Sequence, residues 1–167
     1  MVVCSHSIIA LMRHGEAETA SATGKDYDRA LSKKGFIQAT TAGKFLKHYI
    51  NTPEIIPCSP SLRTRQTLDA IHFEHPVKTI FNDKLYCGSV TDYLSMIVSA
   101  FETGFPALVI GHNPTISTAI SRLSHSDNRS SRFSKMLRPV GFAVIDFPEH
   151  IGKDIAGQGQ LVTVIQP

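Results

Sequence analysis

Tryptophan is absent from this 167-residue sequence, and cysteine, with three residues, is scarce. The three cysteines, Cys4, Cys58 and Cys87, are odd in number and show no paired spacing, so no disulfide framework is expected and a reducing compartment fits. No apolar run approaches the roughly 18 residues that suggest a membrane span, and the N-terminus has no basic region followed by a long apolar segment. These absences predict a cytoplasmic protein that does not cross a membrane.

Basic residues outnumber acidic ones only slightly, 17 to 14, which gives a formal net charge of +3. They are scattered along the chain, and the longest basic run is the pair Lys33-Lys34. Nucleic-acid binding usually requires a stripe of positive charge or an aromatic-rich basic patch, and the sequence has neither. A small anionic ligand is the better prediction. The length, with 42% hydrophobic residues, predicts a single domain over residues 1–167.

Short apolar runs and stretches of helical periodicity alternate along the chain, as is typical of an α/β protein. Residues 8–12 and 107–110 are wholly apolar and predict strands that are covered on both faces. Further strands are predicted at residues 54–58, 77–81, 141–147 and 161–165, and helices at residues 32–50, from 60 onward, 89–101 and 114–123. Loops are predicted at residues 16–30, 83–88 and 124–138. Asn113 is the predicted N-cap of the last helix and Pro114 its first residue.

The first buried run ends in Arg13, His14 and Gly15, so a cation and an imidazole follow directly on a strand. In open parallel sheets, ligands bind beyond the carboxyl ends of the strands. Gly15 has no Cβ, which allows the backbone to turn sharply and a ligand to approach it closely. An anion is the natural ligand for such a strand end.

Two further strand ends carry matching chemistry. Ser59 is the predicted N-cap of a helix whose first residue is Pro60, so Arg63 falls in or just after the first turn. The helix dipole and the unpaired N–H groups of that turn attract anions. His112 follows the buried run at residues 107–110 in the same way that His14 follows the first.

Arg13, His14, Arg63 and His112 therefore converge if the three strands share one carboxyl edge. Two guanidinium groups and two imidazoles describe a phosphate site. The planar fork of arginine matches phosphate oxygens and stays charged at any working pH, so a pair can hold a phosphoryl group and stabilise its transition state. An imidazole nitrogen can attack phosphorus and form a phosphoenzyme that water hydrolyses later.

In combination, these motifs closely resemble those of the histidine phosphatase superfamily. The resemblance covers residues 8 to about 123, and the remaining tail matches only in general shape. Ala30 stands where the family usually has proline. The matching motifs are Arg13-His14-Gly15, the Asp-Arg-Ala-Leu-Ser-Lys-Lys-Gly segment at residues 28–35, Ser59-Pro60 with Arg63, Gln66 and Thr67, and Gly111-His112-Asn113-Pro114.

This resemblance implies a role for each of the four side chains. His14 becomes the phosphorylated nucleophile, Arg13 and Arg63 bind the phosphate, and His112 is the second imidazole at the transferring group. The short chain and the segment at residues 28–35 point to the SixA-type branch, which is similar to bacterial phosphohistidine phosphatases. The implied fold is a three-layer, mixed and mostly parallel sheet with helices on both faces, as in phosphoglycerate mutase. No cofactor and no metal are implied.

A general acid is missing from the recognised motifs. Members that act on sugar phosphates or phosphoglycerate typically carry a Glu for this purpose, and the nearest carboxylates here are Asp83, Asp92 and Glu16, each a weak candidate. An alcohol leaves as an alkoxide and needs a proton, since its pKa lies near the ~15.7 of water. A protonated imidazole leaves as a neutral ring, with a conjugate-acid pKa of about 6.5. The missing acid therefore favours a phosphoramidate, although a phenol or an anhydride also fits.

The leading hypothesis is a phosphatase for phosphohistidine on a protein, such as a phosphotransfer domain or a phosphocarrier. A second is a small-molecule phosphomonoesterase or mutase of the phosphoglycerate mutase type, acting on a phosphorylated metabolite. A third is a non-catalytic phosphoprotein binder, which the intact His14 argues against. A fourth is metal binding around His72 and His75, for which no third ligand is evident. No nucleic acid or membrane is expected as a partner.

Overall fold

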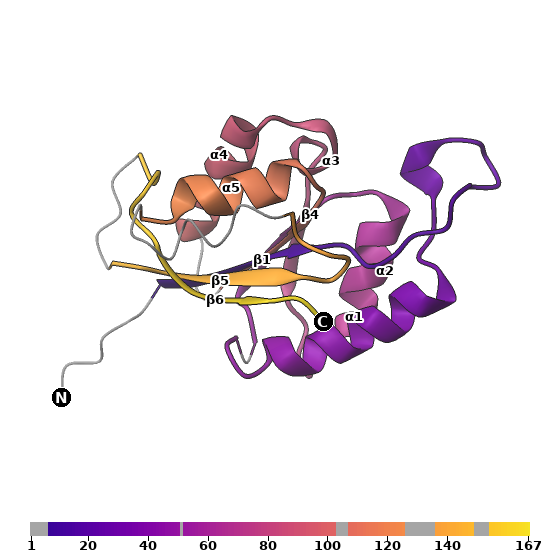
Figure 1. Ribbon diagram of the computed structural model, residues 1–167, viewed down its shortest axis with the longest axis horizontal. Coiled ribbons are helices and arrows are strands. Elements are labelled where there is room, and N and C mark those ends of the chain that lie inside the picture. The colour runs from indigo at the N-terminus through magenta and orange to yellow at the C-terminus, as the bar shows by residue number, and fades with distance from the viewer. Residues whose placement is uncertain (1–6, 51, 103–106, 126–135, 149–153) are drawn as a thin grey trace.

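A single six-stranded sheet organises the chain in the computed structural model, which describes residues 7–50, 52–102, 107–125, 136–148 and 154–167 (Figure 1). The strand order is β3-β2-β4-β1-β5-β6. The strands are β1 (Ser7–Arg13), β2 (Ile55–Cys58), β3 (Lys78–Phe81), β4 (Ala107–Gly111), β5 (Phe142–Phe147) and β6 (Gln160–Ile165). All six predicted strands are present.

The sheet is mixed and mostly parallel. β1, β4, β2 and β3 pair in parallel, and β5 is antiparallel to both of its neighbours, β1 and β6. The register places Arg13 of β1 opposite Gly111 of β4, so the residues that follow the two strands leave the sheet at the same level. The predicted fold class, a three-layer sheet of the phosphoglycerate mutase type, is confirmed.

Helices cover both faces of this sheet (Figure 1). The helices α1 (Lys33–Leu46) and α2 (Leu62–Ile71) pack on one face, and α4 (Val90–Phe101) and α5 (Thr115–Leu123) pack on the other. Side chains of β1 alternate between the two layers: Ile9 and Leu11 join the core under α4 and α5, while Ala10 and Met12 join the core under α1 and α2. The wholly apolar run is thus explained by burial on both faces.

Two predicted helix starts are wrong by one or two residues. α2 begins at Leu62 with Ser61 as N-cap, not at Pro60 with Ser59 as N-cap. The Ser59 hydroxyl lies 2.8 Å from His112 Nε2, so a tertiary contact takes the group that was expected to cap the helix. α5 begins at Thr115 with Pro114 as N-cap, after a cis Asn113–Pro114 bond. Asn113 is again used elsewhere, since its Oδ1 accepts from the Ser117 hydroxyl and its Nδ2 donates to Leu137 O.

Two predicted loops contain short helical elements. The loop at 83–88 holds α3 (Lys84–Cys87), which is anchored by the fully buried Leu85. The loop at 16–30 holds the single-turn 3-10 helix η1 (Asp26–Asp28). α1 ends at Leu46, before the predicted end at residue 50. Most of the predicted loop at 124–138 lies outside the described residues.

None of the helices in the described part of the chain is long and apolar enough to cross a membrane. Cys58 is buried and Cys87 is exposed, and both are free thiols. Among the described residues, no group of three or more His, Cys, Asp or Glu side chains is placed to hold a metal ion. His72 and His75 are both exposed.

Candidate active site

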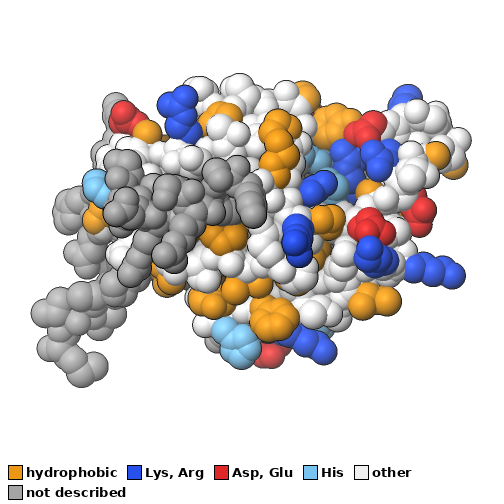
Figure 2. Space-filling model, viewed as in Figure 1, with side chains coloured by type: hydrophobic (Ala, Val, Ile, Leu, Met, Phe, Trp, Pro, Cys, Tyr) orange, Lys and Arg blue, Asp and Glu red, His pale blue; other side chains and the backbone are white. Residues whose placement is uncertain are grey.

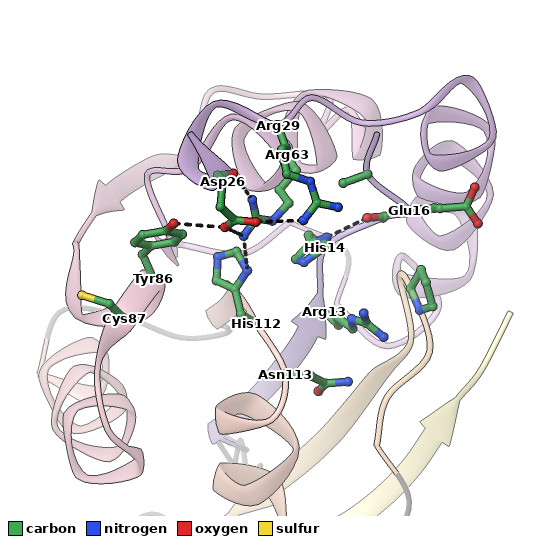
Figure 3. Close-up of a pocket in the computed structure, with 13 residues that line it drawn as sticks. Arg13, His14, Glu16, Asp26, Arg29, Arg63, Tyr86, Cys87, His112 and Asn113 are labelled. Carbon is green, nitrogen blue, oxygen red and sulfur yellow. Dashed lines mark hydrogen bonds and ion pairs between the residues drawn. The ribbon is translucent and has the colours of Figure 1, made fainter. Parts of the chain in front are cut away.

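The four predicted side chains meet in one pocket at the carboxyl edge of the sheet (Figure 3). Arg13 and His14 come from the end of β1, Arg63 from the first turn of α2 behind β2, and His112 from the residue after β4. The cavity has a volume of about 550 Å³. In Figure 2 it is seen as a hollow, with pale-blue histidine atoms below the blue and red side chains of its rim. The predicted convergence of these residues is therefore observed.

Among the described residues, His14 has a hydrogen-bond partner for one ring nitrogen and none for the other. Its Nδ1 lies 2.6 Å from the carbonyl oxygen of Gly15, and a carbonyl only accepts, so the proton is assigned to Nδ1. Nε2 then carries the lone pair. Burial, together with the charges of Arg63, Arg13 and Arg29, lowers the pKa of His14 to about 4, against the opposing effect of the Gly15 hydrogen bond. The ring is neutral at pH 7, which is the form a nucleophile requires.

Gly15 holds the backbone directly after His14 close to α1 and α2. Its N–H donates to Thr67 Oγ1 at 3.0 Å, which ties the end of β1 to α2. A Cβ at this position would lie 2.9 Å from the backbone oxygen of Gly35 in α1. The glycine predicted for a close approach is thus required, although the close neighbour is another backbone segment.

His112 is bound on both sides of its ring. Nε2 lies 2.8 Å from Ser59 Oγ and 3.5 Å from Ser61 Oγ, and Nδ1 faces Arg63 Nη2 at 3.4 Å. A guanidinium only donates, so Nδ1 is assigned as the acceptor and Nε2–H as the donor to Ser59. Burial, followed by the charge of His14, lowers the pKa of His112 to about 3. The two imidazole centroids are 4.9 Å apart, and both rings are neutral at pH 7.

Arg13 and Arg63 are anchored differently. Arg13 Nη1 donates to Leu137 O at 2.9 Å, and its Nε is buried without a hydrogen-bond partner in the described part of the chain. Burial, and then the charge of Arg63, lowers the pKa of Arg13. Arg63 donates from Nη1 to Asp26 O at 2.6 Å and from Nη2 to Asp26 Oδ2 at 2.9 Å. Nη2 also faces His112 Nδ1, so Nε–H and the second Nη1 hydrogen are the groups left for an anion among the described residues.

The sequence reasoning missed three residues that form the opposite wall of the pocket: Asp26, Arg29 and Tyr86 (Figure 3). Asp26 Oδ1 accepts from Arg29 Nη1 at 2.8 Å, and Oδ2 accepts from the Tyr86 hydroxyl at 3.0 Å. The hydrogen bond from Arg29, followed by those from Arg63 and Tyr86, lowers the pKa of Asp26 to about 2. Arg29 lies in a recognised motif, which was a usable signal, but nothing in the loop composition singled out Asp26 or Tyr86.

Glu16 lines the pocket but its carboxylate is turned outward (Figure 3). Oε2 forms an ion pair with Lys34 Nζ at 2.9 Å, and Oε1 accepts from the Ser32 hydroxyl at 3.3 Å. The hydrogen bond from Lys34 lowers the pKa of Glu16. An ionised carboxylate that faces away from both histidines is poorly placed to donate a proton.

Asp83 and Asp92, the other two carboxylates considered as acids, do not line the pocket. Asp92 closes the capping box of α4: its carboxylate accepts from Ser89, and the Ser89 hydroxyl accepts from the Asp92 N–H. These bonds lower the pKa of Asp92. Asp83 is an exposed residue at the start of α3. Neither side chain belongs to the site.

The fold is an α/β sheet, and arginines and neutral imidazoles lie together at its carboxyl edge. Such an arrangement is suited to binding and transferring a phosphoryl group. The model of the histidine phosphatase superfamily (branch 1) matches residues 9–86, which contain Arg13, His14 and Arg63. Over this segment the chain is similar to the histidine phosphatase superfamily. This similarity supports phosphatase activity.

Three proteins that are similar to this chain illustrate the resemblance. A Nakamurella multipartita protein assigned as phosphohistidine phosphatase SixA is 27% identical, with a TM-score of 0.84 over 98% of this chain and 97% of that one. A protein histidine phosphatase SixA complexed with tungstate matches with a TM-score of 0.78 over 95% of this chain and 96% of that one. Its sequence identity is 23%, so this match supports similarity of the fold alone. The uncharacterized protein Rv1276c of Mycobacterium tuberculosis is 28% identical over 83% of this chain and 89% of its own length.

Proposed function

We propose that this protein is a phosphatase of the SixA type that hydrolyses phosphohistidine on another protein, through a phosphorylated intermediate on His14. The observation that carries the proposal is the state of the pocket carboxylates. In the described part of the chain these are Glu16 and Asp26, and each is held ionised by cationic partners. Neither supplies the proton that an alkoxide leaving group requires.

The chemistry of the leaving group connects this observation to the substrate. An alkoxide has a conjugate acid near the ~15.7 of water, whereas an imidazole that keeps a proton on its second nitrogen leaves as a neutral ring with a conjugate-acid pKa of about 6.5. The difference removes the need for an acid. A phosphorylated imidazole is therefore the substrate that this pocket is best equipped to use.

The first step is transfer of the phosphoryl group to the enzyme. His14 Nε2 attacks phosphorus, a P–N bond forms to His14, and the P–N bond to the substrate ring breaks. Arg13 and the remaining N–H groups of Arg63 stabilise the phosphoryl oxygens as charge redistributes in the transition state. His112, whose ring lies 4.9 Å from that of His14, completes the wall around the transferring group.

Hydrolysis of the phosphoenzyme is the second step. Phosphorylated His14 is a cationic ring with Nδ1–H still bound to Gly15 O, so the enzyme ring leaves as readily as the substrate ring did. Water attacks phosphorus, and the P–Nε2 bond breaks with its electron pair returning to Nε2, so His14 is again the neutral Nδ1–H ring. The released phosphate takes up the oxygen and both protons of the water. The same residues serve both steps because both break a P–N bond.

A phosphorylated protein, such as a phosphotransfer domain or a phosphocarrier, is the partner that this proposal requires, and the cytoplasm is its place of action. Similarity to structures assigned as phosphohistidine phosphatases supports the choice. A small phosphorylated metabolite remains the alternative substrate that the experiment must separate from it.

The test measures phosphate release from a phosphohistidine-bearing protein beside a panel of phosphate monoesters, with the wild type and His14→Ala. We expect release that prefers phosphohistidine and disappears in the variant. Faster turnover of monoesters would reject the proposed substrate class. Binding of phosphoprotein without any turnover would reject the enzymatic proposal in favour of a phosphoprotein binder.

A further inference from the structure

We infer that Asp26 makes the pocket selective for phosphorylated imidazoles, by accepting the N–H of the second nitrogen of the substrate ring. The inference rests on the proposed function and deepens it, because it assigns the group that recognises the leaving ring. It is carried by the position of Asp26, whose ionised carboxylate lies among the arginines and rings of the pocket, whereas the carboxylate of Glu16 is turned outward (Figure 3).

The proposed transfer is symmetric in its chemistry, and this symmetry defines what the substrate side needs. The substrate ring enters with phosphorus on one nitrogen and a proton on the other, and it leaves as a neutral imidazole that keeps the proton. His14 changes in the opposite sense, and its Nδ1–H is bound by Gly15 O at 2.6 Å throughout. No proton changes place, so a matching acceptor for the N–H of the substrate ring stabilises that ring in its reactive cationic form.

Asp26 has the capacity to be this acceptor. A carboxylate offers about four lone-pair positions, and three are used here, by Arg29 on Oδ1 and by Arg63 and Tyr86 on Oδ2. In the part of the chain that the structure describes, one position on Oδ1 is left. The side chain is 52% exposed and lines the cavity, so this position is accessible to a ligand. The carboxylate of Glu16 is paired with Lys34 and, in contrast to that of Asp26, points away from the two histidines (Figure 3).

The wall beside Asp26 suits a flat ring. Tyr86 packs edge to face on His112 with centroids 5.5 Å apart, and its hydroxyl donates to Asp26. An aromatic side chain next to a carboxylate accommodates an imidazolium by stacking and by charge. The same carboxylate repels a phosphate ester that carries an acidic group of its own. Asp26 therefore favours the cationic ring and disfavours acidic metabolites.

The experiment compares Asp26→Asn with the wild type on two small substrates, 1-phosphoimidazole and phenyl phosphate. A phenolate leaves without an N–H to donate, so only the first substrate uses the proposed bond. Loss of a charge-assisted hydrogen bond is expected to lower kcat/KM for 1-phosphoimidazole by about 10- to 100-fold. Asp26 also anchors Arg63, so kcat/KM for phenyl phosphate is expected to fall as well, but by a clearly smaller factor, and the ratio of the two kcat/KM values is the quantity that tests the inference.

Asp28→Asn is the matched control, since Asp28 lies in the same turn, accepts from the Thr23 hydroxyl at 2.6 Å and does not line the pocket. Asp28→Asn is expected to leave kcat/KM for both substrates unchanged. Inhibition by inorganic phosphate reports whether Arg63 has kept its place in Asp26→Asn. Equal losses on both substrates with weakened phosphate inhibition would mean that Asp26 acts only through Arg63, and would overturn the inference. No loss on either substrate would overturn it as well.

The two proposals fail in distinguishable ways. A wild type that releases nothing from a phosphohistidine-bearing protein rejects the proposed function, while the two small substrates still report the selectivity of the pocket. A wild type that accepts the phosphoprotein, with unaltered selectivity in Asp26→Asn, rejects the inference alone.

Discussion

His14 and His112 follow neighbouring parallel strands at the same level of the sheet, yet their rings are bound in opposite ways. His14 gives its Nδ1 proton to the adjacent carbonyl of Gly15 and keeps Nε2 open. His112 directs Nε2 into a buried pair of serine hydroxyls and Nδ1 toward Arg63. Identical side chains at equivalent strand ends thus acquire different capacities, because local hydrogen-bond partners decide which nitrogen retains a lone pair.

Removing His14 should have the largest effect of any substitution in the site. Loss of a nucleophile that acts together with its pocket is expected to lower kcat by at least about 10,000-fold, because no covalent intermediate can form. The measurement is single-turnover phosphate release together with an alkaline quench, because phosphohistidine survives alkali and is hydrolysed by acid. A His14→Ala variant that still accumulated acid-labile phosphoenzyme would show that another residue is the nucleophile.

His112→Ala should be the next most severe change, and it should differ in kind. The variant keeps Nε2 of His14 but loses a ring that stabilises the transferring group, so we expect kcat to fall by about 100- to 1,000-fold. Phosphoenzyme should still form, only slowly. If His112→Ala formed none at all while His14→Ala did, the roles of the two rings would have to be exchanged.

Ser59→Ala tests the bond that distinguishes His112 from His14. The change leaves His112 Nε2–H with only the more distant Ser61 hydroxyl, so about 1–3 kcal/mol of stability and a roughly 10-fold loss of kcat are expected. Urea unfolding and steady-state kinetics measure the two effects. Ser61→Ala is the matched control with the longer 3.5 Å contact, and it should affect kcat less. Equal losses of kcat in the two variants would show that the hydrogen bond from His112 to Ser59 is no more important than the contact with Ser61.

The smallest of the expected effects is the change in the free energy of unfolding with pH near pH 7. Both rings have a folded-state pKa below the unfolded value of about 6.5: about 4 for His14 and about 3 for His112, through burial first. Below pH 6.5, therefore, the two histidines bind protons in the unfolded chain but not in the folded chain. The stabilisation is complete above pH 6.5 and is lost as the pH falls toward 4, with a slope of at most about 1.4 kcal/mol per pH unit for each ring.

Urea unfolding between pH 7 and pH 5 measures this slope in the wild type and in His14→Asn. The variant lacks one of the two buried rings, so its slope over this range should be shallower. An unchanged slope would show that burial of His14 does not govern the acid sensitivity of the fold. The activity of the wild type should persist down to the pH at which His14 takes up a proton, near its pKa of about 4.

Much of this molecule was readable from local pattern. The apolar run of β1 predicts a strand covered on both faces, and the order of strands and helices predicts the α/β class; both are confirmed in the sheet and its two helical layers. Arg13, His14, Arg63 and His112 were each identified at a strand end, and the structure places all four in one pocket. Their assignment to catalysis and phosphate binding stays a prediction.

The two misplaced helix caps arise from competition between possible partners. Ser59 and Asn113 have the chemistry of helix caps, but the Ser59 hydroxyl binds His112, and the Asn113 side chain binds Ser117 and Leu137. His112 and Leu137 are distant in sequence, so no local pattern predicts those contacts. Asp26 was missed for the same reason, since Arg63 and Tyr86 lie 37 and 60 positions away.

The sequence by itself determined which residues end the buried strands, because hydrophobic periodicity and the chemistry of glycine, arginine and histidine are local properties. Only the tertiary structure decided the states of those side chains. The neutrality of both imidazoles, the open Nε2 of His14 and the ionised carboxylate of Asp26 depend on burial and on partners from other elements. Protonation and hydrogen bonding respond to neighbours in space, and the folded chain alone defines those neighbours.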